Sequence, residues 1–232
     1  MKDVKTPGNT EQTKRKSKIS SAVINRLPKY FRHLRDLAQN NVLRISSSEL
    51  SERMNATASQ IRQDFNCFGE FGQQGYGYNV KYLGSQISEI LGVNKQYNAV
   101  IIGLGNLGRA LARSKLFANR GITLTALFDV NTELVGKKFD DKYVYDMADF
   151  ESYCENNRVD IAVLTMPRDC TFDVVKRLSH TNIKGIWNFT GADISRSVCK
   201  KPVENIHMGD SLMILCYKIK SEEAEKADRG EK

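Results

Sequence analysis

The chain has 232 residues, a net charge of +8 from 35 basic and 27 acidic side chains, and a hydrophobic share of 41%. That share supports a folded core and excludes wholesale disorder. No apolar run approaches the roughly 18–20 residues of a membrane span, and the polar, lysine-rich N-terminus lacks the apolar stretch of a secretory signal.

Cysteine spacing indicates a reducing compartment. The five cysteines stand at positions 67, 154, 170, 199 and 216, and no two form a Cys-x-x-Cys pair. This pattern predicts neither a disulfide framework nor a zinc site, so we expect a cytoplasmic protein without a metal. We interpret Cys67 as a small apolar core residue rather than a redox sensor.

The charge is unevenly distributed along the chain. Residues 1–96 carry 15 basic and 8 acidic side chains, whereas residues 97–232 carry 20 and 19. An asymmetry of this kind favours a half that binds a polyanion joined to a nearly neutral half. A solvated basic face with a basic tail is the alternative.

The N-terminal region predicts an arm followed by a helix. Residues 1–18 are polar and basic, and we expect a disordered arm there. Apolar residues from Ser20 to Asn40 follow the spacing of an amphipathic helix. Pro28 is expected to kink or restart this helix.

Two shorter helices are predicted next. Ser46 and Glu49 have the spacing of a capping box, which predicts a helix through Met54. Thr57 or Asn55 is expected to cap a third helix that ends near position 67. Three helices with such short links are typical of a helix-turn-helix core.

A glycine-rich segment follows the third helix. Residues 68–78 hold four glycines and four aromatic side chains, a composition that does not continue a helix. Aromatic residues favour strands and glycines permit tight turns, so we predict a β-ribbon, the wing of a winged helix. A linker is the alternative. Another amphipathic helix over Val80–Leu91 leads to a domain boundary at Gly92–Gln96.

The second half alternates strand and helix patterns, which predicts a parallel sheet covered on both faces. The expected strands are Asn98–Ile102, Ile122–Phe128, Asp160–Met166 and the closing Gly185–Phe189, and the expected helices are Leu107–Phe117 and Asp169–Ser179. An apolar helix over Met208–Ile219 and a charged tail at 221–232 complete the chain.

A glycine motif between the first strand and the next helix predicts a dinucleotide site. The run Gly103-Leu104-Gly105-Asn106-Leu107-Gly108 fits G-x-G-x-x-G, and Asp129 ends the following strand. The glycines permit a tight turn, close approach of pyrophosphate and packing of helix on strand, while the helix N-terminus offers free N–H groups. Asp129 is expected to accept both ribose hydroxyls and to repel a 2′-phosphate, which favours NAD(H) over NADP(H).

Two further loops follow predicted strands at the edge of the sheet where ligands bind. They are Thr165-Met166-Pro167-Arg168 and the segment from Trp187 to Gly191, which includes Asn188, Phe189 and Thr190. Either loop is a candidate for the nicotinamide half of the cofactor, and an ordinary strand–helix loop is the alternative for each.

The sequence contains no recognisable catalytic residues. It has three histidines, lacks a Tyr-x-x-x-Lys pair and leaves no room for a substrate domain beside the dinucleotide fold. A small NAD-dependent oxidoreductase with a basic extension remains an alternative, favoured by substrate-dependent NADH turnover. A scaffold that uses a vestigial Rossmann domain to dimerise is a third, which a cofactor titration separates.

Several motifs together resemble the Rex family of redox-sensing transcriptional repressors. The resemblance runs in order from about Ser21 to Lys220. It includes Arg26-Leu27-Pro28-x-Tyr30-Phe31-Arg32, Ile45-Ser46-Ser47, Gln60-Ile61-Arg62-Gln63-Asp64-Phe65, Phe68-Gly69-x-Phe71-Gly72-x-x-Gly75-x-Gly77-Tyr78, the glycine motif, Ile183-Lys184-Gly185-Ile186-x-Asn188-Phe189 and Val203-Glu204-Asn205.

The resemblance implies an α/β protein with a winged-helix domain at 19–94 and a Rossmann NAD(P)-binding domain at 95–207. It also implies a homodimer that exchanges the C-terminal helix at 208–220. NAD⁺ and NADH are the implied effectors and compete for the Rossmann site; NADH closes the dimer and releases double-stranded operator DNA. Each nucleotide shifts the open–closed equilibrium only by its differential affinity for the two states.

The resemblance also suggests which side chains meet DNA, with Arg62 as the strongest contact. The family often carries basic residues where this chain has Gln63, Gln73 and Gln74, which predicts a gentler salt dependence. The expected DNA-binding residues are Arg26, Arg32, Ser46, Ser47, Ser59, Gln60, Arg62, Gln63, Gln73, Gln74 and Tyr76.

The family's switch is only partly matched. Family members pair an arginine, here Arg32, with an acid that turns to a tyrosine when NADH binds. The acid position falls on His207 and the tyrosine position on Ser114. We hypothesise that Asp210, one turn later, replaces the acid. Titration of His207 is the rival and predicts DNA release that varies between about pH 5.5 and 7.5.

Overall fold

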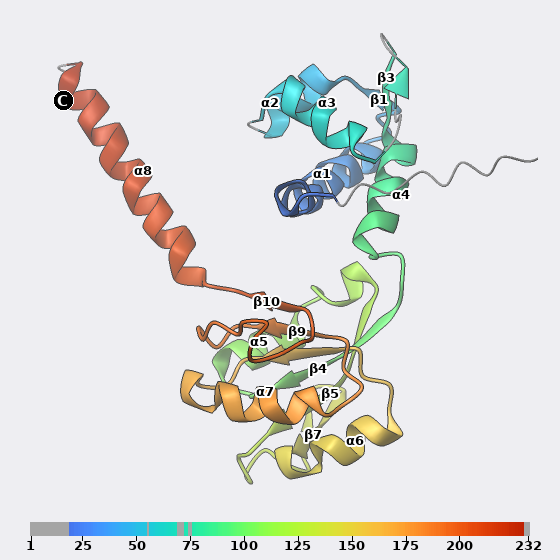
Figure 1. The fold of residues 1–232 in the computed structure, drawn as a ribbon, viewed down its shortest axis with the longest axis vertical. Coiled ribbons are helices and arrows are strands. Elements are labelled where there is room, and N and C mark those ends of the chain that lie inside the picture. Colours follow the sequence, from blue (N-terminus) through green and yellow to red (C-terminus); the bar gives the residue numbers. More distant parts are fainter. Residues whose placement is uncertain (1–18, 55, 69–71, 74–75, 230–232) are drawn as a thin grey trace, which may run out of the picture. The chain divides into compact units, whose positions relative to one another are not determined.

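The computed structural model describes residues 19–229 except 55, 69–71 and 74–75 (Figure 1). The chain divides into two compact units, Met1–Asn94 and Lys95–Lys232. The predicted arm at 1–18 and the last three residues of the predicted tail lie outside the described residues. In the described part, no helix is long and apolar enough to cross a membrane.

The first unit is a small helical domain with a three-stranded antiparallel sheet ordered β1-β3-β2. Its core is formed by side chains from all four helices, including Leu27, Leu50, Ile61 and Leu83. The elements are α1 (Ser21–Gln39), β1 (Arg44–Ile45), α2 (Ser47–Met54), α3 (Ala58–Asn66), β2 (Gly72–Gln73), β3 (Gly77–Asn79) and α4 (Val80–Leu91).

Helix α1 does not restart at Pro28, so that part of the prediction is wrong. It is one helix of 19 residues with the proline inside. Proline removes one backbone hydrogen bond from a helix interior. Leu27, Tyr30 and Leu34 are almost fully buried around it, and packing of this face holds the helix together across the missing bond.

The predicted caps are present. The Ser46 N–H donates to Glu49 Oε2 at 2.7 Å and the Glu49 N–H donates to Ser46 Oγ at 3.1 Å, which confirms the capping box. Of the two alternatives for α3, Thr57 is the cap, because its Oγ1 accepts from the Gln60 N–H at 3.1 Å. Helices α2 and α3 are therefore joined by a very short connection, as a helix-turn-helix requires.

The second unit contains a seven-stranded sheet in the order β10-β9-β8-β4-β5-β7-β6, parallel throughout except for β6. The predicted parallel sheet is thus confirmed, but β9 does not close it, because β10 follows at the edge. The elements are β4 (Tyr97–Ile102), α5 (Asn106–Arg113), η1 (Ala118–Arg120), β5 (Ile122–Asp129), β6 (Lys138–Phe139), β7 (Lys142–Asp146), η2 (Met147–Asp149), α6 (Phe150–Asn156), β8 (Ile161–Leu164), η3 (Arg168–Cys170), α7 (Thr171–Ser179), β9 (Gly185–Asn188), β10 (Val203–Asn205) and α8 (Met208–Asp228).

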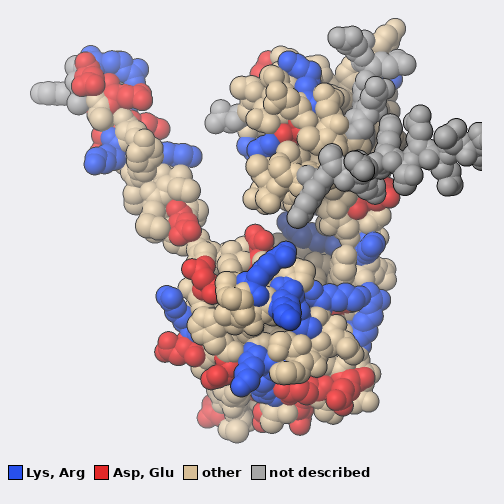
Figure 2. Space-filling model, viewed as in Figure 1, with Lys and Arg blue, Asp and Glu red and all other residues tan. Residues whose placement is uncertain are grey.

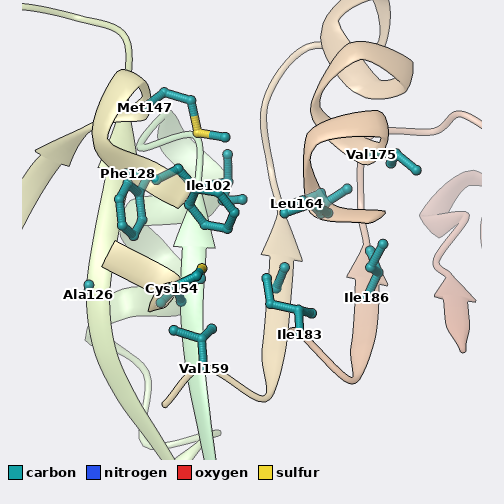
Figure 3. Packing of buried hydrophobic residues seen from close by; sticks show 14 of the residues in the cluster. Ile102, Ala126, Phe128, Met147, Cys154, Val159, Leu164, Val175, Ile183 and Ile186 are labelled. Atoms are coloured by element: carbon teal, nitrogen blue, oxygen red, sulfur yellow. The ribbon is translucent and has the colours of Figure 1, made fainter. Parts of the chain in front are cut away.

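Alternate side chains of the central strands pack on opposite faces of this sheet. Ile102, Phe128 and Leu164 pack with side chains of α6 and α7, including Cys154 and Val175 (Figure 3). Burial raises the pKa of the Cys154 thiol to about 11, as expected for a core residue. Cys67, by contrast, is exposed at the C-terminal end of α3, so its interpretation as a core residue is wrong. On the other face, residues such as Ile101, Leu127 and Val163 pack with side chains that include Leu111 of α5.

Several helices differ in length from their predictions. Helix α7 begins at Thr171 rather than Asp169, after the short η3 turn. Helix α5 ends at Arg113 rather than Phe117, and a short η1 turn follows. Helix α8 continues to Asp228, into the segment predicted as a tail. Glu, Ala and Lys in this segment are good helix formers. The middle of α8 is uncharged and charges gather toward its C-terminal end (Figure 2).

Candidate functional site

The glycine motif builds a tight loop from β4 into α5. Gly103 has φ +96°, and a Cβ there would lie 2.6 Å from the Met166 N atom. A Cβ on Gly108 would lie 2.1 Å from the Gly103 carbonyl oxygen. Both positions therefore require glycine, Gly103 for its conformation and Gly108 for the approach of helix to loop.

Gly105 differs from these two glycines. A Cβ built on it would meet no atom within 4 Å. Gly105 is also the N-cap of α5, so no side chain caps that helix N-terminus. The first N–H groups of a helix lack intrahelical partners and attract anions. The open space at Gly105 therefore suits close approach of a phosphate group.

Asp129 lies beside this loop, at the end of β5. Its Oδ2 accepts from the Leu104 N–H at 2.5 Å and its Oδ1 accepts from the Asn131 N–H at 2.9 Å. Each carboxylate oxygen retains a further lone pair. The side chain is thus held in one orientation and can still accept hydrogen bonds from a ribose.

A cavity of about 430 Å³ joins these groups. Seven predicted cofactor residues line it: Gly103, Leu104, Gly105, Asp129, Thr165, Met166 and Pro167. Asn106, Leu107 and Gly108 form the start of α5 instead. Eight further residues that line the cavity were not predicted as cofactor residues: Ile102, Arg109, Val130, Asn131, Leu134, Met147, Cys170 and Val174. Of these, Ile102, Arg109 and Val130 directly adjoin predicted residues in the sequence.

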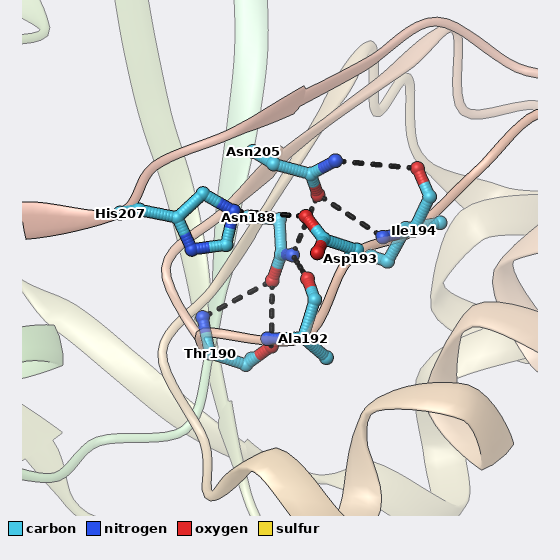
Figure 4. A network of polar contacts seen from close by, with 7 residues as sticks. All are labelled: Asn188, Thr190, Ala192, Asp193, Ile194, Asn205 and His207. Carbon is cyan, nitrogen blue, oxygen red and sulfur yellow. Dashed lines mark hydrogen bonds and ion pairs between the residues drawn. The ribbon is translucent and has the colours of Figure 1, made fainter. Parts of the chain in front are cut away.

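The second predicted loop does not line this cavity. Asn188 is 1% exposed; its Nδ2 donates to the Ala192 carbonyl at 2.6 Å and to Asn205 Oδ1 at 2.8 Å (Figure 4). The Thr190 Oγ1 donates to Asn188 Oδ1 at 2.8 Å. Asn188 and Thr190 thus form an internal polar network, and neighbouring Phe189 packs against Trp187.

In the first unit, α3 presents an exposed row of side chains. Ser59, Arg62 and Gln63 are exposed, and Arg62 Nη1 donates to Ser47 Oγ of α2 at 2.9 Å. On the ribbon, Tyr76 is 70% exposed and lies 5.9 Å from the Arg44 guanidinium. This helix and ribbon form the candidate nucleic-acid surface. Arg32 is also exposed, Ser46 is half-buried in the capping box, Gln73 is described through its backbone, and Gln74 lies outside the described residues.

Arg26 and Gln60, two of the predicted DNA-binding residues, donate hydrogen bonds to a buried carboxylate. Asp64 of α3 is 1% exposed. Its oxygens accept from Arg26 Nε at 2.6 Å and Nη2 at 2.7 Å, from Tyr30 Oη at 2.7 Å and from Gln60 Nε2 at 2.8 Å. We call these four residues the Asp64 network. Its hydrogen bonds from Arg26 and Tyr30 connect α1 to α3.

The Asp64 network should make the first unit sensitive to acid. Burial raises the pKa of Asp64, but hydrogen bonds from Arg26, Tyr30 and Gln60 outweigh burial and hold it below its usual value. A lowered folded-state pKa adds stability above the unfolded-state pKa near about 4, and this stability is lost as the pH falls through the folded-state value.

We expect Asp64→Ala to lower the free energy of unfolding at neutral pH by about 3 kcal/mol, because the Arg26 guanidinium loses its partner. This loss is at the low end for a buried ion pair, since the Arg26 side chain is one-third exposed. Denaturant unfolding of wild type and variant at pH 7 and pH 3 measures the effect. The difference should shrink at pH 3. An equal difference at both pH values would show that the carboxylate charge is irrelevant.

The four predicted switch residues lie on α1, at the end of α5, in the link before α8 and in the first turn of α8. Arg32 is on α1 and Ser114 is the exposed C-cap of α5. His207 Nε2 lies 2.9 Å from Asp193 Oδ1 (Figure 4), and Asp210 is exposed in the first turn of α8.

Family models match both halves of the chain. The model described as "Putative DNA-binding protein N-terminus" matches residues 18–66, and the "CoA binding domain" model matches residues 94–192. These matches agree with the helix-turn-helix in the first unit and the nucleotide-type cavity in the second.

Relatives match almost the whole chain. Redox-sensing transcriptional repressor Rex of Clostridium tetani (strain Massachusetts / E88) is 47% identical over 90% of this chain and 99% of its own length. The protein of the same name from Thermoanaerobacter pseudethanolicus (strain ATCC 33223 / 39E) is 47% identical, over 94% of this chain and 96% of its own.

Solved structures agree in fold. RSP in complex with β-NAD⁺ and operator DNA is 46% identical, with a TM-score of 0.82 over 93% of this chain and 99% of its own. RSP in complex with β-NADH is 43% identical, with a TM-score of 0.82 over 91% and 99%. The predicted winged-helix and Rossmann architecture is confirmed, and the chain belongs to the Rex family of redox-sensing transcriptional repressors.

Proposed function

We propose that this protein is a DNA-binding repressor whose affinity for operator DNA is set by the ratio of NADH to NAD⁺. The observation that carries the proposal is whole-chain similarity to RSP, which has been crystallised with β-NAD⁺ and operator DNA and with β-NADH. The helix-turn-helix and the glycine-loop cavity supply the two surfaces that such a function needs.

The residues present fit a dinucleotide. The open position at Gly105 and the uncapped start of α5 suit a pyrophosphate, and the Asp129 carboxylate suits ribose hydroxyls. A charge on Asp129 disfavours a 2′-phosphate. Bound NADH or NAD⁺ acts here as an effector, so the chain's own role is to bind it and to change conformation, without hydride transfer.

Helix α8 supports a homodimer. Its side chains Leu212, Met213, Ile214, Leu215 and Tyr217 are 51–71% exposed. An apolar patch of this kind marks a protein interface. In our proposal, α8 is exchanged between subunits, so that its apolar side chains are buried on the partner and nucleotide binding is transmitted to both first units.

The coupling between sites follows from differential affinity. If NADH binds better to the state that cannot hold the operator, it lowers DNA affinity by the ratio of its affinities for the two states. Linkage then requires operator DNA to weaken NADH binding by the same factor. A difference between NADH and NAD⁺ in this ratio makes the protein a sensor.

The proposal includes no catalysis, as the names of the relatives suggest. The rival is the small NAD-dependent oxidoreductase. Incubation of purified protein with NADH, alone and with candidate carbonyl substrates, should leave the NADH absorbance unchanged while the nucleotide binds. Steady, substrate-dependent loss of NADH would favour the oxidoreductase instead.

For the switch, we propose that Asp210 replaces the family's acid and pairs with Arg32. Asp210→Ala should weaken operator binding about five- to tenfold and reduce the NADH response, since a favourable ion pair contributes about 1 kcal/mol. Operator titrations of both proteins measure this. Unchanged affinity and response would contradict the role of Asp210.

The rival role of His207 has its own signature. In that case His207→Gln would weaken operator binding and the NADH response, whereas Asp210→Ala would leave both unchanged. Asp193→Asn is the variant to compare with His207→Gln, because Asp193 Oδ1 contacts His207 Nε2.

A further inference from the structure

Asp64 is a buried charge that the proposed function does not require. Replacing a buried ion pair by apolar residues of similar volume is often neutral or stabilising. A buried carboxylate whose two oxygens accept four hydrogen bonds is better suited to fixing orientation. Of the donors, Gln60 lies on α3 itself, in its first turn, where helix-turn-helix proteins contact base edges.

The Asp64 network determines which end of the Gln60 amide points outward. An ionised carboxylate only accepts hydrogen bonds, so Gln60 must present its Nε2 to Asp64. The amide oxygen, Oε1, is bonded to the same carbon and is turned away from the carboxylate. Within the described part of the chain, Nε2 is the atom of this amide with a hydrogen-bond partner.

We infer that Asp64 is a positioning residue for base recognition, which holds the Gln60 amide so that its oxygen accepts a hydrogen bond from the exocyclic amino group of a base. In the major groove, adenine N6 and cytosine N4 carry such a group, whereas guanine and thymine present acceptors there. The inference rests on the proposed function, because it requires α3 to enter the major groove.

Asp64→Asn tests the orientation directly, because asparagine has the same shape but a different hydrogen-bond pattern. We expect the Asn oxygen to take the position of Oδ2, which accepts from Arg26 Nε and Tyr30 Oη, so that its NH₂ group replaces Oδ1 and faces Gln60 Nε2. Two donors cannot pair, so the Gln60 amide should turn over and present Nε2 outward. At one position of one DNA strand, we expect the preference for adenine or cytosine over guanine or thymine to fall about tenfold or more.

The experiment compares wild type, Asp64→Asn, Gln60→Ala and the double variant. Wild type first selects DNA from a randomised duplex library, and anisotropy titrations then measure each protein on that duplex and on its single-base-pair substitutions. The inference expects both single variants to lose preference at the same base pair, with no further loss in the double variant. Losses at different base pairs, or losses that add, would overturn it.

Tyr30→Phe is the matched control. It removes one donor to Asp64 but keeps the contact with Gln60. It should lower the unfolding temperature and leave the base profile unchanged. If the role of Asp64 were purely structural, Asp64→Asn would also leave the base profile unchanged. The affinities for all duplexes would then fall by the same factor, and this result would contradict the inference.

The outcomes separate the inference from the proposed function. Selection of one DNA sequence by wild type supports the proposed function whatever the variants do, and failure to select any sequence contradicts both. If Asp64→Asn does not fold, the Gln60→Ala profile decides: loss of preference at one base pair supports the inference, and an unchanged profile overturns it.

Discussion

Gly105→Ala should abolish the response of DNA binding to NADH without destabilising the protein. The added Cβ meets no protein atom within 4 Å, and the backbone at Gly105 has φ −70°, which alanine adopts freely. The methyl group instead occupies the space where a pyrophosphate approaches the helix N-terminus. We expect NADH affinity to fall at least about 100-fold, a loss of roughly 3 kcal/mol, while operator affinity without nucleotide stays the same.

Two other glycines make this result specific. Gly108→Ala should also impair NADH binding, but its Cβ collides with the Gly103 carbonyl, so the free energy of unfolding should fall by about 1–3 kcal/mol. Gly185→Ala, whose Cβ meets the Pro202 carbonyl at an ordinary 3.5 Å, should change neither property. Calorimetric NADH titration and thermal unfolding of the three variants distinguish these cases. NADH binding by Gly105→Ala at wild-type affinity would contradict the assignment of the site.

Arg62→Ala should produce the largest loss of DNA affinity among single substitutions in the first unit. Arg62 is exposed on α3, and its guanidinium is held by Ser47 Oγ. A bidentate arginine–guanine contact contributes about 1–3 kcal/mol of discrimination, which is roughly 5- to 150-fold in affinity. Anisotropy titration on the selected duplex measures the loss.

Arg62→Lys and Arg120→Ala are the controls. Lysine keeps the charge but not the planar fork, so Arg62→Lys should lose most of the specific affinity and keep the salt dependence. Arg120 lies in the second unit, and its removal changes the net charge by the same amount as Arg62→Ala. An equal effect of Arg62→Ala and Arg120→Ala would indicate that charge alone matters.

Local rules predicted much of the fold. The capping box at Ser46 and Glu49 and the cap at Thr57 depend on residues three apart, and the glycine loop depends on six consecutive residues. Such short-range patterns are legible in one sequence. The continuous apolar strands β4 and β5 were legible for the same reason.

Elements that depend on partners far away in the chain could not be predicted from the sequence. Strand β1 has two residues and forms only by pairing with β3, more than 30 positions later. The edge strands β6 and β10 have only two and three residues. A strand of two or three residues carries no periodic signal, so its existence depends on tertiary pairing.

The candidate site shows the same limit. No local pattern in the sequence shows that Asp64 is buried, because its ion-pair partner Arg26 lies 38 positions earlier. Asn188 follows a strand at the expected edge of the sheet, yet its amide is occupied by Ala192 and Asn205. Spacing along the chain places a residue near a site but does not show which partner takes its polar atoms.

Operator affinity measured while NADH and NAD⁺ are titrated separately tests the central claim most directly. Typical coupling free energies of about 1–3 kcal/mol correspond to roughly 5- to 150-fold. We therefore predict that saturating NADH lowers the affinity for the selected duplex by about 10- to 100-fold, that NAD⁺ does not, and that DNA weakens NADH binding by the same factor. DNA affinity that is indifferent to both nucleotides would contradict the account.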